Sequence, residues 1–280
     1  MLPTITFENK QPVVFLPSGT KVSRHFKTKE DKFIRVKNLL SNGDSNTKLL
    51  KSNKANKNIV TYGLSLSPAT TGNYKGNRFD NCESASPACR AACLNGAGLA
   101  SIFESIAVSR LCKTLVYRLA NKWFINRLDQ ELHNKTKTAN KNNQMVAVRP
   151  NVLSDLRFED TGIIDNHPTI QFYDYTKHTD RVGAVRPNYW VTFSQSELNH
   201  WHASRFPKQG KNVAVVFAHP ESKALTKLPD TYKGVEVING DKNDMRFEDK
   251  RGVYVGLELK TPTIKEYRRA VKSGFCVLTS

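Results

Sequence analysis

Short apolar segments recur along the chain from residue 61 onward, and polar stretches separate them. There are eight such segments, at residues 61–67, 145–150, 169–175, 189–194, 213–219, 235–239, 253–259 and 275–279. Their length and their β-branched and aromatic content predict β-strands. Most are almost continuously apolar, which is expected when both faces of a parallel sheet are covered. The pattern therefore predicts an α/β fold built on eight strands.

The longest interval between two predicted strands contains the strongest helical signal. Apolar residues at helical spacing predict a helix within residues 101–133. A second helix is predicted at residues 263–273. Shorter helices are predicted to begin at Ser86 and at one of Ser194 and Ser196, because serine is favoured at the N-cap. The apolar positions of the long helix are Ile102, Ile106, Leu111, Leu115, Leu119, Trp123, Phe124 and Leu128.

Strands joined by helical connections favour a (β/α)8-like barrel of the TIM type, or a distorted version of it. A doubly wound sheet is the alternative. Two earlier apolar runs, residues 5–7 and 13–16, predict a small β-hairpin, and the polar stretch 41–58 predicts a surface loop. The 280 residues then form one domain, in which residues 1–60 extend a barrel formed by residues 61–280.

The charge of the chain points to an anionic partner. Lys and Arg number 43 against 25 Asp and Glu, a formal net charge of +18. Such a balance favours nucleic acid or a small anionic ligand as the partner. The basic residues are spread along the chain, however, and charged surface residues also keep a protein solvated. No apolar run approaches the roughly 20 residues that span a bilayer, and residues 1–10 lack the apolar region of a secretory signal. We therefore expect no membrane partner and a cytoplasmic location.

Three cysteines lie close together in the sequence. Cys82, Cys89 and Cys93 have the spacing C-x6-C-x3-C, whereas Cys112 and Cys276 lie in apolar segments typical of a core. Clustered cysteines in a cytosolic protein indicate metal or redox chemistry. A closed structural zinc site needs four ligands, but a 4Fe–4S cluster with one open iron needs three thiolates. The spacing favours that cluster; zinc with a distant fourth ligand, or three buried cysteines without metal, are the alternatives.

Polar residues follow several predicted strands and form a second candidate set. Carboxyl ends of parallel strands meet at one rim of a barrel, so these side chains are expected to line a polar, basic cavity facing the open iron. Arg149, Lys177 and Arg246 would bind the anionic groups of a substrate. Ordinary caps and salt bridges are the alternative for each residue. The set is Arg149, Asn151, Asp174, Tyr175, Lys177, Ser194, His219, Asp241, Asp244 and Arg246.

One short motif occurs twice. Residues 154–160 and 243–249 both contain Asp-x-Arg-Phe-Glu-Asp, and both follow a predicted strand. Duplicated strand–loop units would produce such a pair and, in a barrel, would place both loops at the same rim. Chance would also produce it.

The cysteine-containing loop follows the first predicted strand and leads into the first long helix. In this it resembles the radical S-adenosylmethionine enzymes, although their common spacing is C-x3-C-x2-C. That resemblance implies S-adenosylmethionine as a ligand of the open iron and radical-type catalysis.

A second resemblance covers more of the chain. Residues 84–94, 171–177, 192–194 and 239–241, with Asp244 and Arg246, resemble an uncharacterised phage domain family named after a mycobacteriophage gene product. This implies a bacteriophage or prophage origin, and hence the host cytoplasm, but no known activity.

These observations predict a viral iron–sulfur protein that acts on an anionic substrate. The sequence identifies no catalytic residue and no reaction. The alternative is a nucleic-acid-binding phage protein whose metal site is structural. In that case exposed aromatic side chains would stack on bases; the candidates are Tyr173, Tyr175, Tyr189, Trp190 and Trp201.

Overall fold

The computed structural model describes residues 2–23, 25–43, 47–69, 72–74, 77–93, 102–223, 225, 227–261 and 263–279. All eight predicted segments form strands, and all eight belong to one large sheet in which they pair in parallel. They are β5 (Ile59–Leu64), β8 (Met145–Arg149), β9 (Gln171–Thr176), β11 (Tyr189–Ser194), β12 (Val213–Ala218), β14 (Val235–Asn239), β15 (Tyr254–Glu258) and β16 (Val277–Leu278).

The predicted (β/α)8 barrel is wrong, because the sheet is open. The strand order is β13-β14-β15-β12-β11-β9-β8-β5-β4, with β10 paired to β11 and β16 paired to β12. Closure would require the last strand to pair with β5, but antiparallel β4 occupies that edge of β5. The antiparallel additions are β4 (Leu40–Asn42), β10 (Gly183–Arg186) and β13 (Thr231–Tyr232).

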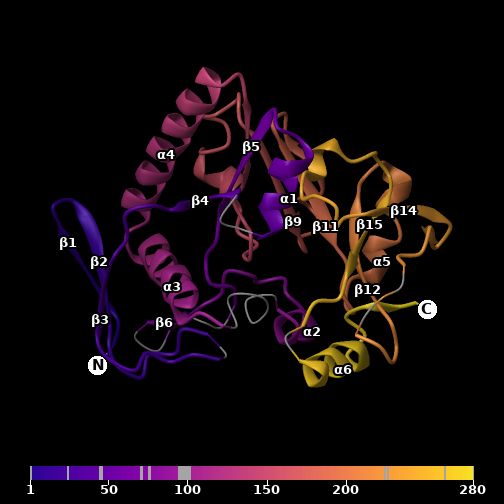
Figure 1. The fold of residues 1–280 in the computed structure, drawn as a ribbon, viewed down its shortest axis with the longest axis horizontal. Helices are drawn as coiled ribbons and strands as arrows, with labels where there is room; N and C mark the ends of the chain where they lie inside the picture. Colours follow the sequence, from indigo (N-terminus) through magenta and orange to yellow (C-terminus); the bar gives the residue numbers. More distant parts are fainter. Residues whose placement is uncertain are drawn as a thin grey trace.

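The helices cover only part of the sheet, so the outer helical ring of a barrel is also missing (Figure 1). The predicted helix at residues 101–133 forms as two helices, α3 (Glu104–Leu119) and α4 (Asn121–Lys141). The chain leaves helical geometry at Ala120, with φ −136° and ψ 47°. Both helices bury apolar side chains in the same core as Val148 and Phe172 of the sheet.

The remaining helices are short. The predicted helix at 263–273 is α6 (Ile264–Lys272), with Thr263 as N-cap. The helix expected from Ser194 or Ser196 begins later, as α5 (His200–Ala203). The predicted surface loop at 41–58 contains α1 (Thr47–Ala55), whose Leu49 is fully buried. The others are α2 (Pro87–Ala91) and the 3-10 turns η4 (Phe158–Thr161), η5 (Pro207–Gln209) and η6 (Arg246–Glu248).

The predicted N-terminal hairpin is present and carries a third strand. β1 (Thr4–Glu8), β2 (Gln11–Leu16) and β3 (Lys32–Arg35) form an antiparallel sheet beside α3 (Figure 1). A two-stranded ribbon, β6 (Gly72–Tyr74) and β7 (Asn77–Phe79), precedes the cysteines. No helix among the described residues is long and apolar enough to cross a membrane.

Candidate cysteine-loop site

The segment from residue 80 to residue 93, called the cysteine loop below, is fixed by buried polar contacts. The Asn81 amide donates to the Ser67 carbonyl at 2.6 Å, and its oxygen accepts from the Arg118 guanidinium at 2.7 Å. Arg90 donates to the Ala85 carbonyl at 3.0 Å and to the Cys82 carbonyl at 3.1 Å. The start of the loop is therefore bonded to other segments, and Arg90 ties the middle of the loop to itself.

The short helix α2 begins as the sequence predicts. Ser86 is the N-cap, and its hydroxyl accepts a hydrogen bond from the Cys89 amide at 3.2 Å. Glu197 accepts from the Ser86 hydroxyl at 2.7 Å and from the Ala88 amide at 2.9 Å. A carboxylate at a helix N-terminus is favourable because backbone N–H groups there lack partners. Sequence reasoning missed Glu197, since no spacing rule connects it to the loop.

Glu197 reaches the loop because it follows β11 at the point where β11 stops pairing with β12. The first half of β12 pairs with β11, ending at Ser194 and Ala214, whereas Phe217 and Ala218 pair with β16. Beyond Ser194, therefore, the chain leaves the sheet. In open α/β sheets, ligand sites lie at such places, outside the carboxyl ends of the strands.

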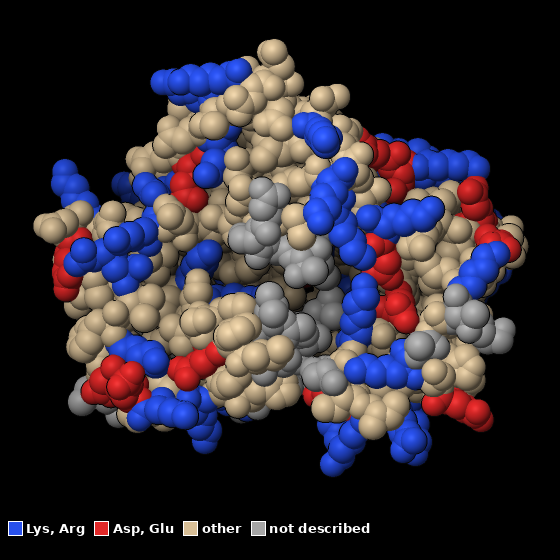
Figure 2. All heavy atoms as spheres, viewed as in Figure 1, with Lys and Arg blue, Asp and Glu red and all other residues tan. Residues whose placement is uncertain are grey.

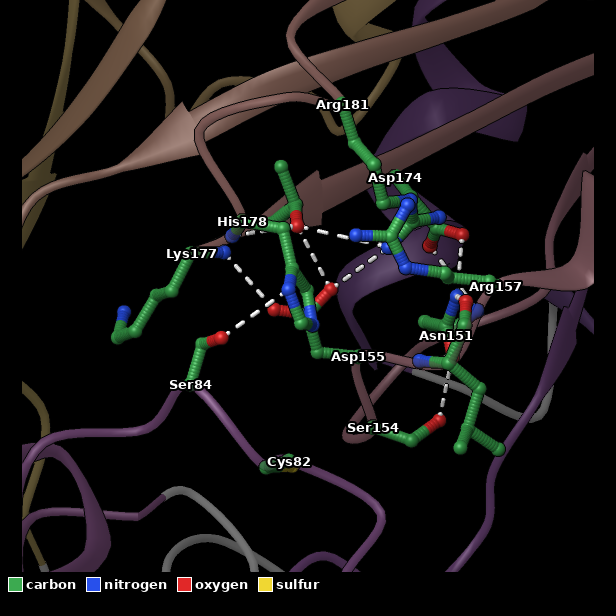
Figure 3. A network of polar contacts seen from close by, with 12 residues as sticks. Cys82, Ser84, Asn151, Ser154, Asp155, Arg157, Asp174, Lys177, His178 and Arg181 are labelled. Carbon is green, nitrogen blue, oxygen red and sulfur yellow. Dashed lines mark hydrogen bonds and ion pairs between the residues drawn. The ribbon is translucent and has the colours of Figure 1, made fainter.

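The cysteine loop packs against the segments that follow β8 and β9 (Figure 3). The Cys82 thiol donates to the Leu153 carbonyl at 3.4 Å, and the Asp155 amide donates to the Asn81 carbonyl at 2.7 Å. The Ser84 hydroxyl lies 3.1 Å from the His178 Nδ1. The loop thus lies at the carboxyl ends of the parallel strands.

The three loop cysteines are partly exposed free thiols, whereas Cys112 and Cys276 are buried. Burial is the main reason that the pKa of Cys82 is raised to about 12, and the nearby Cys93, Asp155 and Cys89 act in the same direction. The three thiols are therefore electrostatic neighbours. In the described part of the chain, however, no three His, Cys, Asp or Glu side chains are placed to hold a metal ion. The donor set suits an iron–sulfur cluster, but the thiols must move closer to bind one.

A buried ionic network lies beside the loop (Figure 3). The Asp155 carboxylate accepts from the Thr176 hydroxyl at 2.8 Å, the Lys177 amide at 2.8 Å and the Arg181 guanidinium at 2.9 Å. Arg181 also donates two hydrogen bonds to Glu159, at 2.5 and 2.9 Å. Asp155, Glu159 and Arg181 were absent from the predicted site. The only sequence signal for Asp155 and Glu159 was the repeated Asp-x-Arg-Phe-Glu-Asp motif, which contains both.

Asp174 is linked to this network through the Tyr189 hydroxyl, which accepts from Arg181 at 3.2 Å, and it lies 3.9 Å from Arg149. It is fully buried, and accepts from the Asn151 amide group at 2.8 Å, the Asn151 backbone N–H at 2.9 Å and the Tyr189 hydroxyl at 2.8 Å. Burial raises the pKa of Asp174 to about 7, although Arg149, Tyr189 and Asn151 each favour the ionised form. A carboxyl group so poised is able to exchange a proton near neutral pH.

A second group of predicted residues gathers around Arg149. Its guanidinium donates to Asp244 at 2.8 Å and stacks on the Tyr175 ring at 4.5 Å. Arg246 is 1% exposed and lies 3.1 Å from Asp249. Several buried polar atoms here have no hydrogen-bond partner among the described residues: Nε of Arg149, Nε and Nη1 of Arg246, and the Tyr173 hydroxyl.

The remaining predicted residues differ in their roles. Lys177 donates from Nζ to the Ser194 hydroxyl at 2.8 Å, across the ends of β9 and β11. His219 instead accepts from the backbone of Glu221 and Ser222 and so stabilises its own turn. Asp241 accepts from the Glu258 amide at 2.8 Å and pairs with Lys260. The described contacts do not link His219 or Asp241 to the cysteine loop.

The two copies of the repeated motif pack on opposite faces of β9, not at one barrel rim. Phe158 of the first copy lies in the core with Phe172, whereas Phe247 of the second lies 5.4 Å from the Tyr173 ring. Adjacent strand residues point to opposite faces. Each copy nevertheless starts a 3-10 turn, and in each the first Asp binds an arginine from another segment.

Comparison with protein families identifies the wider group. A family model described as Gene product 88 matches residues 38–278. The chain belongs to the Gene product 88 family. This confirms the predicted resemblance to an uncharacterised phage gene-product family and supports a bacteriophage origin. No curated protein and no solved structure matches the chain.

Membership of the Gene product 88 family gives no support to the resemblance to radical S-adenosylmethionine enzymes. That resemblance depended on a three-cysteine loop after the first strand of a barrel. The loop does follow β5 in the sequence, with β6 and β7 between them, but the sheet is open.

We expect Asp174 to contribute a fall in the free energy of unfolding as pH rises between 3.8, the ordinary pKa of Asp, and about 7, the pKa of Asp174 in the fold. Within this window the folded state binds more protons than the unfolded chain, so raising the pH destabilises it. Asp249, whose pKa burial raises to about 6, acts in the same direction. Urea unfolding of wild type and Asp174→Asn across this range measures the effect. The variant should flatten the dependence; identical slopes would contradict the assignment.

Proposed function

We propose that this member of the Gene product 88 family is a viral iron–sulfur protein in which Cys82, Cys89 and Cys93 bind a 4Fe–4S cluster. The observation that carries the proposal is the placement of three partly exposed thiols in one loop, with Cys89 and Cys93 both close enough to Cys82 to affect its charge. That loop lies at the carboxyl ends of parallel strands, where α/β proteins build their sites.

The surroundings of the thiols favour a cluster over free cysteines. Thiolates and the cluster that they hold carry negative charge, which nearby guanidinium groups stabilise. Arg110 lies close enough to Cys93 for the two charges to interact, and Arg90 donates to the loop carbonyls. When bound through three thiolates, the cluster supplies one iron without a cysteine ligand, which is available to a small molecule.

The chain's own polar residues favour an anionic small molecule as the ligand or substrate. Lys177 is partly exposed between the ends of β9 and β11. On the other face, Arg149 Nε, Arg246 Nε and the Tyr173 hydroxyl are buried and have no hydrogen-bond partner among the described residues. Buried donors without acceptors are costly, and an anionic group would satisfy them. S-adenosylmethionine is a net cation, because its sulfonium and ammonium groups outweigh its carboxylate, and only that carboxylate would be held by such donors.

The test is the electron paramagnetic resonance spectrum of the reduced cluster, with and without added S-adenosylmethionine or inorganic phosphate. We expect one of these ligands to shift the spectrum, and Lys177→Ala to raise the ligand concentration needed by several-fold. Lys208→Ala, an exposed lysine on η5, is the matched control and should behave as wild type. A spectrum that neither ligand changes would contradict the anion site, and a protein without a cluster would contradict the whole proposal.

A further inference from the structure

The net positive charge does not by itself identify a binding surface. Lys and Arg side chains are spread over the whole of the viewed face (Figure 2). The aromatic residues first considered for base stacking are also mostly unsuitable, since Tyr173 and Tyr189 are 0% and 1% exposed. A nucleic-acid surface must therefore combine exposed aromatic rings with unpaired basic side chains in one place.

The N-terminal sheet has exposed aromatic rings. Phe33 is 73% exposed, and its strand register places it directly opposite Phe15. The two ring centroids are 4.8 Å apart. Because side chains alternate along a strand, these rings face away from Val14 and Leu16, which belong to the core. The sheet thus presents two adjacent rings on one face, Phe33 exposed and Phe15 partly exposed.

The connection between β2 and β3 carries unpaired lysines. It continues the hairpin as a ribbon, in which Gly19 donates to the Thr28 carbonyl at 2.8 Å and Lys21 faces Lys27 across an isolated bridge. Like charges directly opposite destabilise a ribbon, so an anion bound between them would be favourable. Lys21, Lys27 and Lys29 are exposed, and no described carboxylate pairs with them.

The acidic residues of this region are already engaged elsewhere. The first 37 residues contain eight Lys and Arg against three Asp and Glu. Glu8 binds Arg35, Glu30 lies 3.8 Å from Lys32, and Asp31 accepts from the Ser18 amide. The local charge is therefore complementary to phosphate. This region also precedes residue 38, where the match to the Gene product 88 family begins.

We propose that the face carrying Phe15 and Phe33, with the ribbon bearing Lys21, Lys27 and Lys29, binds single-stranded nucleic acid. Exposed rings stack on unpaired bases without sequence preference, and the lysines contact phosphates. A duplex hides its base faces in the stack and leaves only the phosphates to contact. This surface is distinct from the cysteine loop, so its function does not depend on the proposed cluster.

The experiment measures binding of a fluorescent oligothymidylate to the full-length protein by anisotropy, at several salt concentrations. Phe33→Ala should weaken binding roughly tenfold, because stacking on one aromatic ring is worth on the order of 1–3 kcal/mol. The double variant Lys21→Ala with Lys27→Ala should reduce the slope of log affinity against log salt by about 1.4, or about 0.7 for each phosphate contact.

Two matched controls locate the surface. Trp201→Ala removes a ring that is 60% exposed on α5, and Lys208→Ala removes an exposed lysine on η5. Both should bind the oligonucleotide as wild type does. The proposal is overturned if wild type does not bind, if duplex binds as tightly as single strand, or if Trp201→Ala weakens binding while Phe33→Ala does not. A change of self-association in Phe33→Ala without a change in oligonucleotide binding would identify the face as a contact between protein chains instead.

Discussion

Replacing Cys82, Cys89 or Cys93 with alanine is expected to abolish the broad visible absorption of the anaerobically purified protein. Each of these thiols would supply one of three cluster ligands, and no other cysteine lies in the loop to take its place. Loss of one thiolate from a three-cysteine site leaves two, too few to retain the cluster. The readout is the visible spectrum at equal protein concentration.

Cys112→Ala and Cys276→Ala are the controls for these three variants. Both thiols are buried, Cys112 on the core-facing side of α3 and Cys276 beside α6. Their loss should lower the free energy of unfolding slightly and leave the visible band intact. Loss of the band in Cys276→Ala, with retention in Cys82→Ala, would contradict the assignment of the ligands.

Removing the Arg181 side chain should cause the largest loss of stability among charged residues of the site. The side chain is 2% exposed and binds Glu159 and Asp155. Its replacement by leucine leaves two carboxylates without their cation in a dry environment. Breaking a buried pair in this way costs about 3–5 kcal/mol of the free energy of unfolding. Urea unfolding followed by circular dichroism measures the loss.

Arg157→Ala is the matched control for Arg181. Arg157 pairs with Asp180 at 2.7 Å, but the two side chains are 39% and 61% exposed. Solvent screens such a pair, so its loss should cost at most about 1 kcal/mol. If both variants lost the same free energy of unfolding, burial would not be the reason that the Arg181 ion pairs stabilise the fold.

The eight parallel strands of the large sheet were predictable because each is a short and mostly apolar run. Whether the sheet closes into a barrel was not predictable, because closure depends on which strand pairs with the free edge of β5. The pattern does not distinguish β4, three residues long, from a loop, and β16 pairs through only two residues. Helix α1 was missed because Lys and Asn dominate its sequence, and burial of Leu49 is decided by tertiary packing.

Some neighbours of the cysteine loop were predictable from the sequence, but their contacts were not. Polar residues after parallel strands do gather at the carboxyl ends, as with Asp174 and Lys177. The partners of these residues come from distant segments, as with Glu197 at α2 and Arg181 at Asp155. Nothing in a single sequence distinguishes a buried arginine such as Arg181 from an exposed one such as Arg157. The repeated Asp-x-Arg-Phe-Glu-Asp motif was the usable signal, since each copy binds an arginine.

The iron and acid-labile sulfide content of the full-length protein, purified without oxygen, tests the cluster proposal most directly. A 4Fe–4S cluster predicts about four iron and about four sulfide per chain, with no stoichiometric zinc. One zinc per chain without sulfide would contradict the proposal and identify a structural metal site. Protein that contains neither metal nor sulfide would show that the three cysteines act as free thiols.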